Sequence, residues 1–237
     1  MIYPRSLENN LLSSKYHIEK HGFDLIIKDG FKGKRILEVA CGTGFYSKWL
    51  AENYPDCEVT GVDFAIDKIE TANSNCSGIT NLNFYAGDIS TALPNNYEYF
   101  DLIFVRSALH HMTNNLEGVS TVMYSMLKPN CKCIFIREPL GHNAIWAAVR
   151  AMMNSRKQLT DESNLYIKNI TQFSIPFNKY IIYPFDLLSY MLKILPASLI
   201  TKYIASIFNW FDSLIFKYVP FLKKFGANAN IVFIKKG

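Results

Sequence analysis

Between residues 35 and 137, short apolar runs alternate with segments of helical periodicity. The runs of strand length span residues 35–40, 58–63, 82–86, 100–105 and 132–137. The helical patterns fall between them, near residues 45–53, 65–75 and 115–127. Strands that alternate with helices predict an α/β fold with a mostly parallel sheet and helices on both faces.

The flanking segments differ from this central part. Residues 1–34 are polar, and we expect them to form an N-terminal helical lid, with an edge element of the sheet domain as the alternative. Residues 35–138 then form the core, residues 139–228 a helical cap over the substrate, and residues 229–237 a final strand that returns to the core sheet. The predicted fold is therefore an open, Rossmann-like sheet with an α-helical cap inserted before its last strand.

The first predicted strand runs directly into a glycine turn. Residues 36–44 read Ile-Leu-Glu-Val-Ala-Cys-Gly-Thr-Gly. Gly42 and Gly44 allow positive φ and place no Cβ in the way of a ligand that approaches the backbone. Because open α/β sheets bind ligands beyond the carboxyl ends of their strands, the turn predicts a site for a nucleotide-type cofactor.

Residues suited to bind such a cofactor follow the next strands. Asp63 ends the second strand, where a carboxylate can accept hydrogen bonds from a ribose diol. Asp88 follows the third strand and can accept a hydrogen bond from an adenine amine, with Phe64 and Ile89 placed to sandwich the ring. Arg106 and two histidines follow the fourth strand. An NAD site fits less well, because its fingerprint requires a third glycine where this chain has a serine.

On these motifs, residues 33–137 resemble a class I S-adenosylmethionine-dependent methyltransferase of the small-molecule type. The resemblance implies that S-adenosylmethionine is the cofactor and S-adenosylhomocysteine the product. It also implies that Glu38 and the backbone of residues 40–44 hold the methionine part, although the family has Asp more often than Glu38 and Gly more often than Ala40. The cofactor-binding residues expected in this way are Glu38, Ala40, Cys41, Gly42, Thr43, Gly44, Asp63, Phe64, Asp88, Ile89 and Arg106.

The loops after the fourth and fifth strands hold the candidates for the chemistry. Methyl transfer from a sulfonium is an in-line displacement, for which the protein supplies alignment and, where the acceptor is acidic, a base. His110 and His142 are the candidate catalytic bases, and we expect His110 to face the acceptor and His111 to pack. A structural hydrogen bond is the alternative role for His110. The candidate substrate-binding residues are His111, Arg137, Glu138 and Asn143. We expect no metal site, since the histidines and acids have no ligand spacing.

Residues 198–218 have an uneven helical pattern. Five of their polar residues form one narrow stripe: Lys202, Ser206, Asn209, Ser213 and Lys217. The remaining arc is mainly apolar, so we expect burial against the sheet domain or against a partner in a homodimer. Two alternatives stay open for this segment: an apolar wall for a hydrophobic acceptor, or peripheral contact of the helices of residues 184–225 with a membrane.

Composition narrows the choice of partners. The 237 residues carry a net charge of +5 that is spread along the chain, which argues against a nucleic-acid partner. Five cysteines without CxxC spacing favour a reducing cytoplasm, and we expect neither a signal peptide nor a membrane-spanning helix.

The expected function is methyl transfer to a small-molecule acceptor, preferentially to an oxygen of a specialised metabolite or a glycan sugar. A membrane lipid or quinone as the acceptor, and a non-catalytic cofactor-binding subunit, stay open as alternatives.

Overall fold

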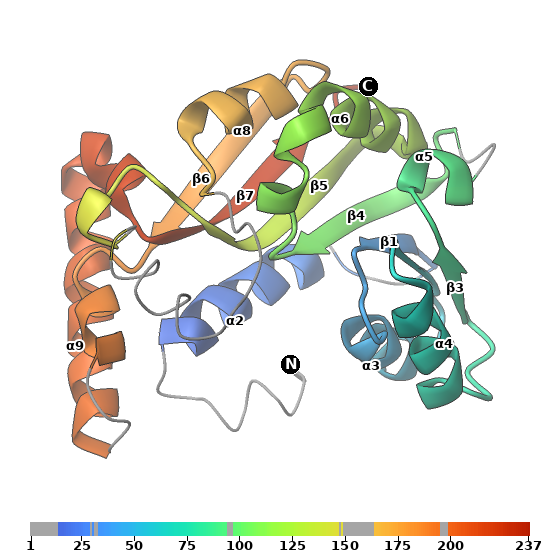
Figure 1. The fold of residues 1–237 in the computed structure, drawn as a ribbon, viewed down its shortest axis with the longest axis horizontal. Coiled ribbons are helices and arrows are strands. Elements are labelled where there is room, and N and C mark those ends of the chain that lie inside the picture. The colour runs from blue at the N-terminus through green and yellow to red at the C-terminus, as the bar shows by residue number, and fades with distance from the viewer. Residues whose placement is uncertain are drawn as a thin grey trace.

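Seven strands form one sheet at the centre of the protein: β1 (Arg35–Val39), β2 (Glu58–Asp63), β3 (Leu82–Ala86), β4 (Phe100–Arg106), β5 (Leu127–Pro139), β6 (Lys179–Phe185) and β7 (Asn228–Ile234). Their order is β3-β2-β1-β4-β5-β7-β6 (Figure 1). Strands β1 to β5 pair in parallel, and β7 runs antiparallel to both β5 and β6. The structure is a computed structural model that describes residues 14–28, 30, 33–93, 97–146, 148, 164–194 and 199–237.

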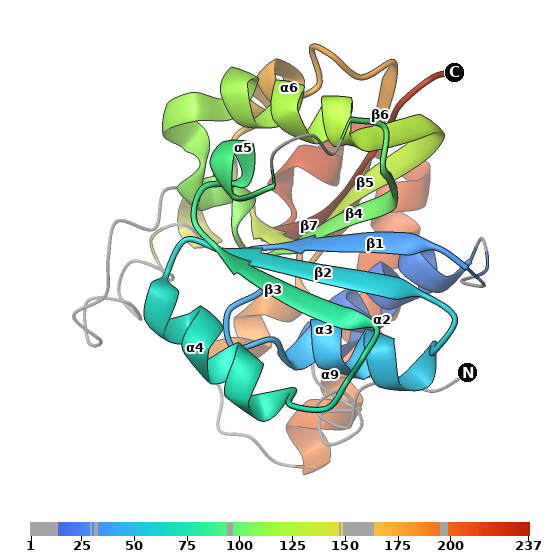
Figure 2. The ribbon, with the colours of Figure 1, turned by 90° about the vertical axis from the view of Figure 1, so that its right-hand side faces the viewer.

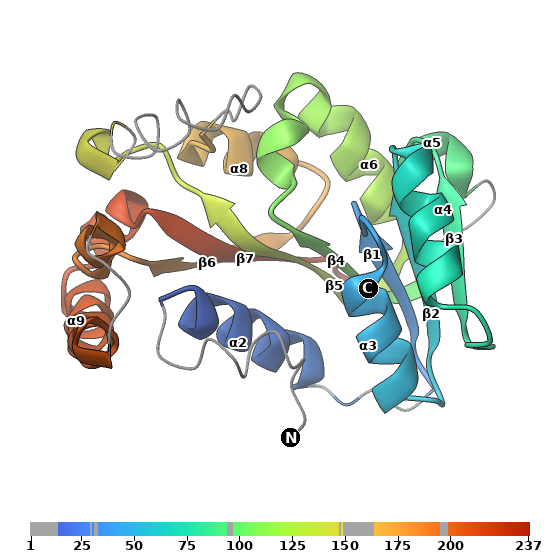
Figure 3. The ribbon, with the colours of Figure 1, turned by 60° about the horizontal axis from the view of Figure 1, so that its bottom comes forward.

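Helices cover the sheet on both faces (Figures 2 and 3). On one face lie α2 (Ser14–Ile27), α3 (Phe45–Asn53) and α4 (Ile66–Asn75); on the other lie α5 (Ile89–Ala92), α6 (Leu116–Met126) and α8 (Ile167–Phe173). The 20-residue helix α9 (Leu199–Tyr218) stands at the β6 edge of the sheet. Four short 3-10 helices complete the described elements: η1 (Leu109–His111), η2 (Thr113–Asn115), η3 (Ser189–Ile194) and η4 (Pro220–Phe225).

The central strands are mainly apolar because both faces of the sheet are covered. Successive side chains of a strand point to opposite faces. In β1, Ile36 packs into the cluster under α2 and α3, whereas Leu37 packs into the cluster under α6 and α8, and neither side chain is exposed. The mainly apolar run of residues 35–40, in which Glu38 is the one acid, is thus the pattern of a buried parallel strand. The predicted α/β fold class is confirmed.

Strand β6 is the element that the sequence did not predict. The range 139–228 was expected to be a helical cap, but its residues Lys179–Phe185 extend the core sheet by pairing with β7. An edge strand has a partner on one side only and all but the first of its residues are half-buried here, so its apolar pattern is weak. Pro184 added to the ambiguity, because proline is tolerated in edge strands but is more typical of loops.

Helix α2 is the described part of the expected N-terminal lid; residues 1–13 lie outside the described residues. Phe23 and Ile26 are buried against the sheet, and Lys132 of β5 donates a hydrogen bond to the carbonyl of Leu25. The helix therefore packs under β5 and β7, with Glu19 at the end nearer the carboxyl ends of the strands. The division of the chain into lid, core and cap stays a prediction.

Within the chain itself, α9 does not bury most of its circumference. The alternative expectation, burial against a partner in a homodimer, stays a prediction. In α9, Ala205, Asp212 and Phe216 are buried, whereas Ile207 and Trp210 are among the large side chains exposed to solvent. These side chains are exposed because α9 contacts η3, η4, α2 and the edge strand β6, and does not lie on a face of the sheet.

None of the described helices is both long enough and apolar enough to span a membrane.

Candidate functional site

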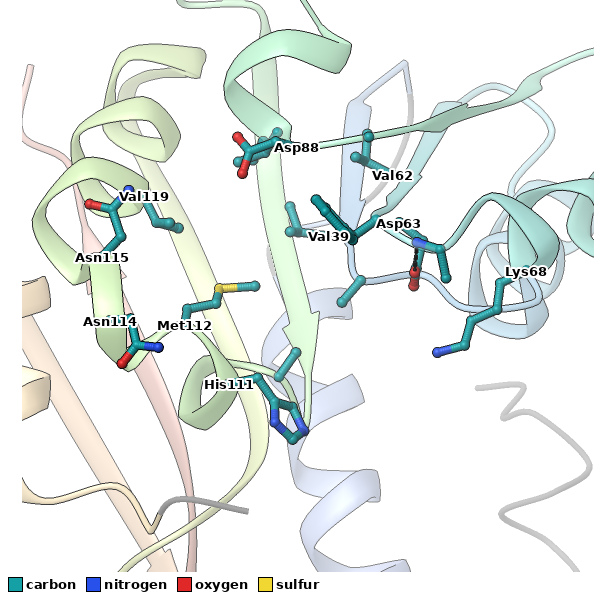
Figure 4. A pocket seen from close by; sticks show the side chains of 16 residues that line it. Val39, Val62, Asp63, Lys68, Asp88, His111, Met112, Asn114, Asn115 and Val119 are labelled. Atoms are coloured by element: carbon teal, nitrogen blue, oxygen red, sulfur yellow. Dashed lines mark hydrogen bonds between the residues drawn. The ribbon is translucent and has the colours of Figure 1, made fainter. Parts of the chain in front are cut away.

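A cavity of about 510 Å³ opens at the carboxyl ends of β1 to β4 (Figure 4). Its lining comes from the ends of these strands and from the loops and helix starts that follow them. Apolar side chains from Val39, Val62 and Ile89 lie between polar groups at the rim. A cavity with apolar walls and a few placed polar groups is the usual form of a cofactor or substrate site.

Asp63 joins the first two of these loops. Its Oδ2 accepts a hydrogen bond from the backbone N–H of Gly42 at 2.7 Å, and its Oδ1 accepts one from the N–H of Ala65 at 3.0 Å. A carboxylate has about four acceptor positions, so two bonds to the backbone leave room for a ligand diol. Asp63 therefore shapes the glycine turn and also lines the cavity.

The glycine turn is held in a conformation that few residues adopt. Gly42 and Gly44 have φ of 55° and 76°, in the left-handed region. A Cβ on Gly44 would lie 2.5 Å from the ring of Phe84, whereas a Cβ on Gly42 would meet nothing within 4 Å. Ala40, with φ of 58°, also takes the left-handed conformation, where the resemblance leads one to expect glycine. Its methyl group borders the cavity.

Glu38 lies beneath the turn, not in the cavity lining. Its side chain is buried and accepts a hydrogen bond from the hydroxyl of Ser47 on α3. Burial raises the pKa of Glu38 to about 8, because a carboxylate loses hydration there and the Ser47 bond only partly compensates. Cys41 is likewise buried, and burial raises the pKa of its thiol. Both residues support the turn from below.

Asp88 lines the cavity and also begins a helix. Its Oδ1 accepts hydrogen bonds from the backbone N–H and the hydroxyl of Ser90, which makes it the N-cap of α5. These two bonds hold the pKa of Asp88 below its ordinary value. Phe64 and Ile89 line the same cavity, and the ring of Phe64 is 80% exposed. The structure thus brings the two predicted acids and the two predicted ring contacts together.

Arg106 and Arg137 are not in the cavity lining; both pair with an acid that the sequence analysis did not single out. Oε1 of Glu19 on α2 accepts hydrogen bonds from Nη2 of Arg106 and, at 2.9 Å, from Nη1 of Arg137. Burial alone would raise the pKa of Glu19, but the two arginines bring it below its ordinary value. The ring of Tyr46 lies against Arg106, 4.9 Å from its guanidinium carbon. This contact could not be predicted from the sequence, because a single acid on a helix does not indicate its partners.

Glu138 organises the loop after β4. The residue has no exposed surface, and its carboxylate accepts hydrogen bonds from the backbone N–H groups of Ala108, Leu109 and His110. Nδ1 of His110 lies 2.8 Å from Oε2 of the same carboxylate. The protein's own donors thus enclose the carboxylate, and Glu138 is not in the cavity lining. Its expected contact with the substrate stays a prediction.

The two neighbouring histidines have the reverse of the predicted orientation. His110 is 4% exposed and turned toward Glu138, whereas His111 is exposed and lines the cavity. The ring centroids lie 4.0 Å apart, so the buried ring supports the exposed one. Figure 4 shows His111 at the lower edge of the lining side chains, below Met112 and Asn114 in this view.

His142 and Asn143 fasten the loop after β5 and are absent from the cavity lining. Nε2 of His142 accepts a hydrogen bond from the backbone N–H of Ile167, at the start of α8. Burial and the charge of Lys224 lower the pKa of His142. Asn143 donates to the carbonyl of Phe225 and accepts from the N–H of Trp146. Both residues have structural partners at the places where a catalytic or substrate role was expected.

Several lining residues were not identified from the sequence. Lys68 reaches the cavity from the first turn of α4, and Asn114 and Asn115 add amides from the segment before α6. Lys68 follows Asp63 by five residues, a spacing that could have placed it beside the second strand end. The two asparagines precede a predicted helix, where Asn is common as an N-cap, so the sequence does not indicate that they line the cavity. Among the described residues, no group of three or more His, Cys, Asp or Glu could hold a metal ion.

The sequence of this chain is similar to known methyltransferases. A family model described as "Methyltransferase domain" matches residues 30–186. Malonyl-[acyl-carrier protein] O-methyltransferase 2 of Ilyobacter polytropus is 30% identical over 121 residues, which are 50% of this chain and 46% of the relative. Demethylmenaquinone methyltransferase of Staphylococcus aureus is 31% identical over 124 residues, 51% of this chain and 50% of the relative. The chain thus spans about half the length of the curated relatives it matches.

Solved structures share the fold at low sequence identity. Phosphoethanolamine N-methyltransferase 2 of Haemonchus contortus, in complex with S-adenosyl-L-methionine, matches 92% of this chain and 53% of its own with a TM-score of 0.62 and 15% identity. The YcgJ protein of Bacillus subtilis matches 92% of this chain and 99% of its own, with a TM-score of 0.57 and 19% identity. These likenesses concern the arrangement of the backbone.

Proposed function

Since the chain belongs to the methyltransferase-domain family, we propose that it is a S-adenosylmethionine-dependent methyltransferase that acts on a small-molecule acceptor. The observation that carries the proposal is the joint placement of Asp63 and Asp88 in one cavity, with Asp63 bonded to Gly42 of the glycine turn. Two acids at neighbouring strand ends suit the two polar ends of an adenosine, the ribose diol and the adenine amine.

The chain's own groups fit the parts of this cofactor. Asp63 would accept from the ribose hydroxyls with the lone pairs that Gly42 and Ala65 leave, and Asp88 would lie at adenine. Phe64 and Ile89 would flank the base. The backbone of residues 40–44 would hold the methionine part. Glu38 would support this turn through its hydrogen bond with Ser47. When bound, the cofactor supplies an electrophilic methyl group on a sulfonium.

We propose an oxygen as the methyl acceptor, such as a hydroxyl of a specialised metabolite or a glycan sugar. His111 supports this choice, because it is the imidazole that lines the cavity and can take a proton from an acceptor hydroxyl. The name of the Ilyobacter relative, an O-methyltransferase, points the same way. The enzyme would otherwise contribute alignment, which alone lowers the barrier of an in-line displacement by several kcal/mol, about 7–11 in the best cases.

A quinone or lipid-linked acceptor is the second candidate. The wall beside His111 is apolar, with Met112 and Val119, and one relative is named a demethylmenaquinone methyltransferase. Incubation with methyl-labelled cofactor separates the candidates when polar metabolites and quinones are offered in parallel. Label transfer to the polar fraction alone supports the first candidate, and transfer to the quinone fraction alone supports the second.

Cofactor binding can be tested without knowing the acceptor. Titration calorimetry of Asp63→Asn should show S-adenosylmethionine affinity reduced by about tenfold to a hundredfold, the loss expected for hydrogen bonds to a charged group. Asp56→Asn changes an exposed acid outside the cavity and is the matched control. A wild-type protein that does not bind the cofactor would contradict the proposal. Binding without S-adenosylhomocysteine formation from either acceptor class would favour a non-catalytic subunit.

A further inference from the structure

Helix α9 turns its most apolar side away from the protein. Ile207, Trp210 and Phe211 are 55%, 58% and 47% exposed, and their spacing of three and four residues places them on one side of the helix. We call this side, with η4, the outer face; its exposed residues are Tyr203, Ile207, Trp210, Phe211, Lys217, Tyr218, Phe221, Lys223 and Lys224. Monomeric soluble proteins rarely leave so many large apolar side chains together in water.

The orientation of α9 is imposed by a buried acid on its inner side. Asp212 accepts hydrogen bonds from the backbone N–H groups of Leu187, Leu188 and Ser189 and from the hydroxyl of Ser189. Turning the helix to hide Trp210 would expose this carboxylate and leave the three N–H groups without it. The outer face therefore stays outward.

All charged side chains of the outer face are lysines. Lys217, Lys223 and Lys224 are exposed, and the only acid in residues 199–225 is the buried Asp212. Nζ of Lys217 lies 5.2 Å from the ring centroid of Tyr218, and Nζ of Lys224 lies 5.1 Å from that of Phe225. Two of the three lysines thus hold their ammonium groups beside aromatic rings.

This mixture favours one kind of occupant. In a symmetric contact with a second copy, the same patch meets itself, so the face would bring lysines toward lysines without an acid of its own to pair them. A bilayer with anionic lipids instead offers phosphates to the lysines and the acyl boundary to the aromatic rings. Lysine stems and the rings of Trp and Tyr are suited to that boundary because each combines an apolar body with a polar end.

We propose that the outer face of α9 and η4 is a peripheral docking surface for an anionic lipid bilayer. In Figures 1 and 3 α9 stands at the opposite end of the molecule from α4 and β3. Lys68 of α4 and Gly87, which follows β3, line the cavity. Docking would therefore leave the mouth of the cavity uncovered. The inference rests on the exposed residues of α9 and η4 and does not depend on the proposed methyl transfer.

Flotation of the full chain with vesicles tests the proposal. We expect binding to phosphatidylcholine vesicles that contain phosphatidylglycerol, and at low salt much less binding to phosphatidylcholine alone. The triple variant Lys217→Gln, Lys223→Gln, Lys224→Gln should lose about fivefold in partition coefficient per lysine. Each of Trp210→Ser and Phe211→Ser should lose on the order of tenfold. Added salt should weaken binding of the wild type more than binding of the lysine variant.

Matched variants separate this surface from general charge and apolarity. Lys28→Gln, Lys34→Gln, Lys236→Gln removes the same charge from other elements, and Tyr97→Ser removes an aromatic ring that is 73% exposed on the turn before β4. Both should bind vesicles like the wild type. Failure of the wild type to float at low salt, or equal loss in the matched variants, would overturn the proposal. So would a dimer in sedimentation equilibrium that Trp210→Ser dissociates, because the face would then belong to a second copy.

Discussion

Nδ1 of His110 lies 2.8 Å from the carboxylate of Glu138, which has no exposed surface. A carboxylate only accepts, so Nδ1 carries the proton and donates it. This contact joins the end of β5 to the loop after β4 and turns His110 away from the cavity. The next residue, His111, consequently faces the cavity.

The first prediction concerns the stability that this contact provides. Glu138→Gln replaces an acceptor of four hydrogen bonds by an amide, one end of which would face donors only. We expect the free energy of unfolding to fall by about 3–5 kcal/mol, as when a buried pair loses one partner. Urea denaturation measures it, with the exposed Glu117→Gln as the control that should change stability by about 0.5 kcal/mol or less. Equal effects in the two variants would contradict the role of Glu138.

The second prediction separates the two histidines. His111→Ala should lower the turnover number by about 10² to 10⁴ while the affinity for S-adenosylmethionine stays unchanged, if His111 is the base. His110→Ala should instead lower the free energy of unfolding, since Glu138 loses a donor in the interior. Calorimetry, thermal denaturation and rates with the identified acceptor distinguish these effects. Unchanged turnover in His111→Ala would remove the base hypothesis.

The third prediction follows from the raised pKa of Glu38. Between the ordinary carboxyl value of 4.5 and the folded value of about 8, the folded state binds the proton more tightly than the unfolded state does. Stability from this group is therefore present below 4.5 and is lost as pH rises toward 8, by on the order of a few kcal/mol. Glu38→Gln should flatten this part of the stability–pH curve in urea denaturation. A wild-type curve with the same slope as the variant would contradict the burial of a neutral Glu38.

The fourth prediction compares two glycines of the same turn. Gly42→Ala should destabilise the protein by about 1–2 kcal/mol, the cost of a left-handed conformation for a residue with a Cβ. Gly44→Ala should cost more, because its Cβ would in addition lie 2.5 Å from the ring of Phe84. The difference in urea midpoint between the two variants measures the contact with Phe84. Equal midpoints would show that the ring of Phe84 can move to accommodate the Cβ without a measurable loss of stability.

Much of the cofactor site could be predicted because its signals are local. The glycine turn, Asp63 and Asp88 each follow directly after a strand, and parallel strands bring such positions to one edge. The orientation of His110 and His111 could not be predicted, since it depends on Glu138, which is distant in the sequence. The partner of Arg106 and Arg137 was equally hidden, because Glu19 reaches them only after α2 packs under the sheet.

The sequence by itself determined the elements of the core and their α/β alternation, because hydrophobic periodicity and glycine conformations are properties of neighbouring residues. Tertiary structure alone decided which side chains of each element face a ligand, the interior or solvent. Strand β6 exists by pairing with β7, and α9 exposes Trp210 because Asp212 is held from the other side. These orientations depend on contacts between residues that are far apart in the sequence, and a local sequence pattern does not indicate such contacts.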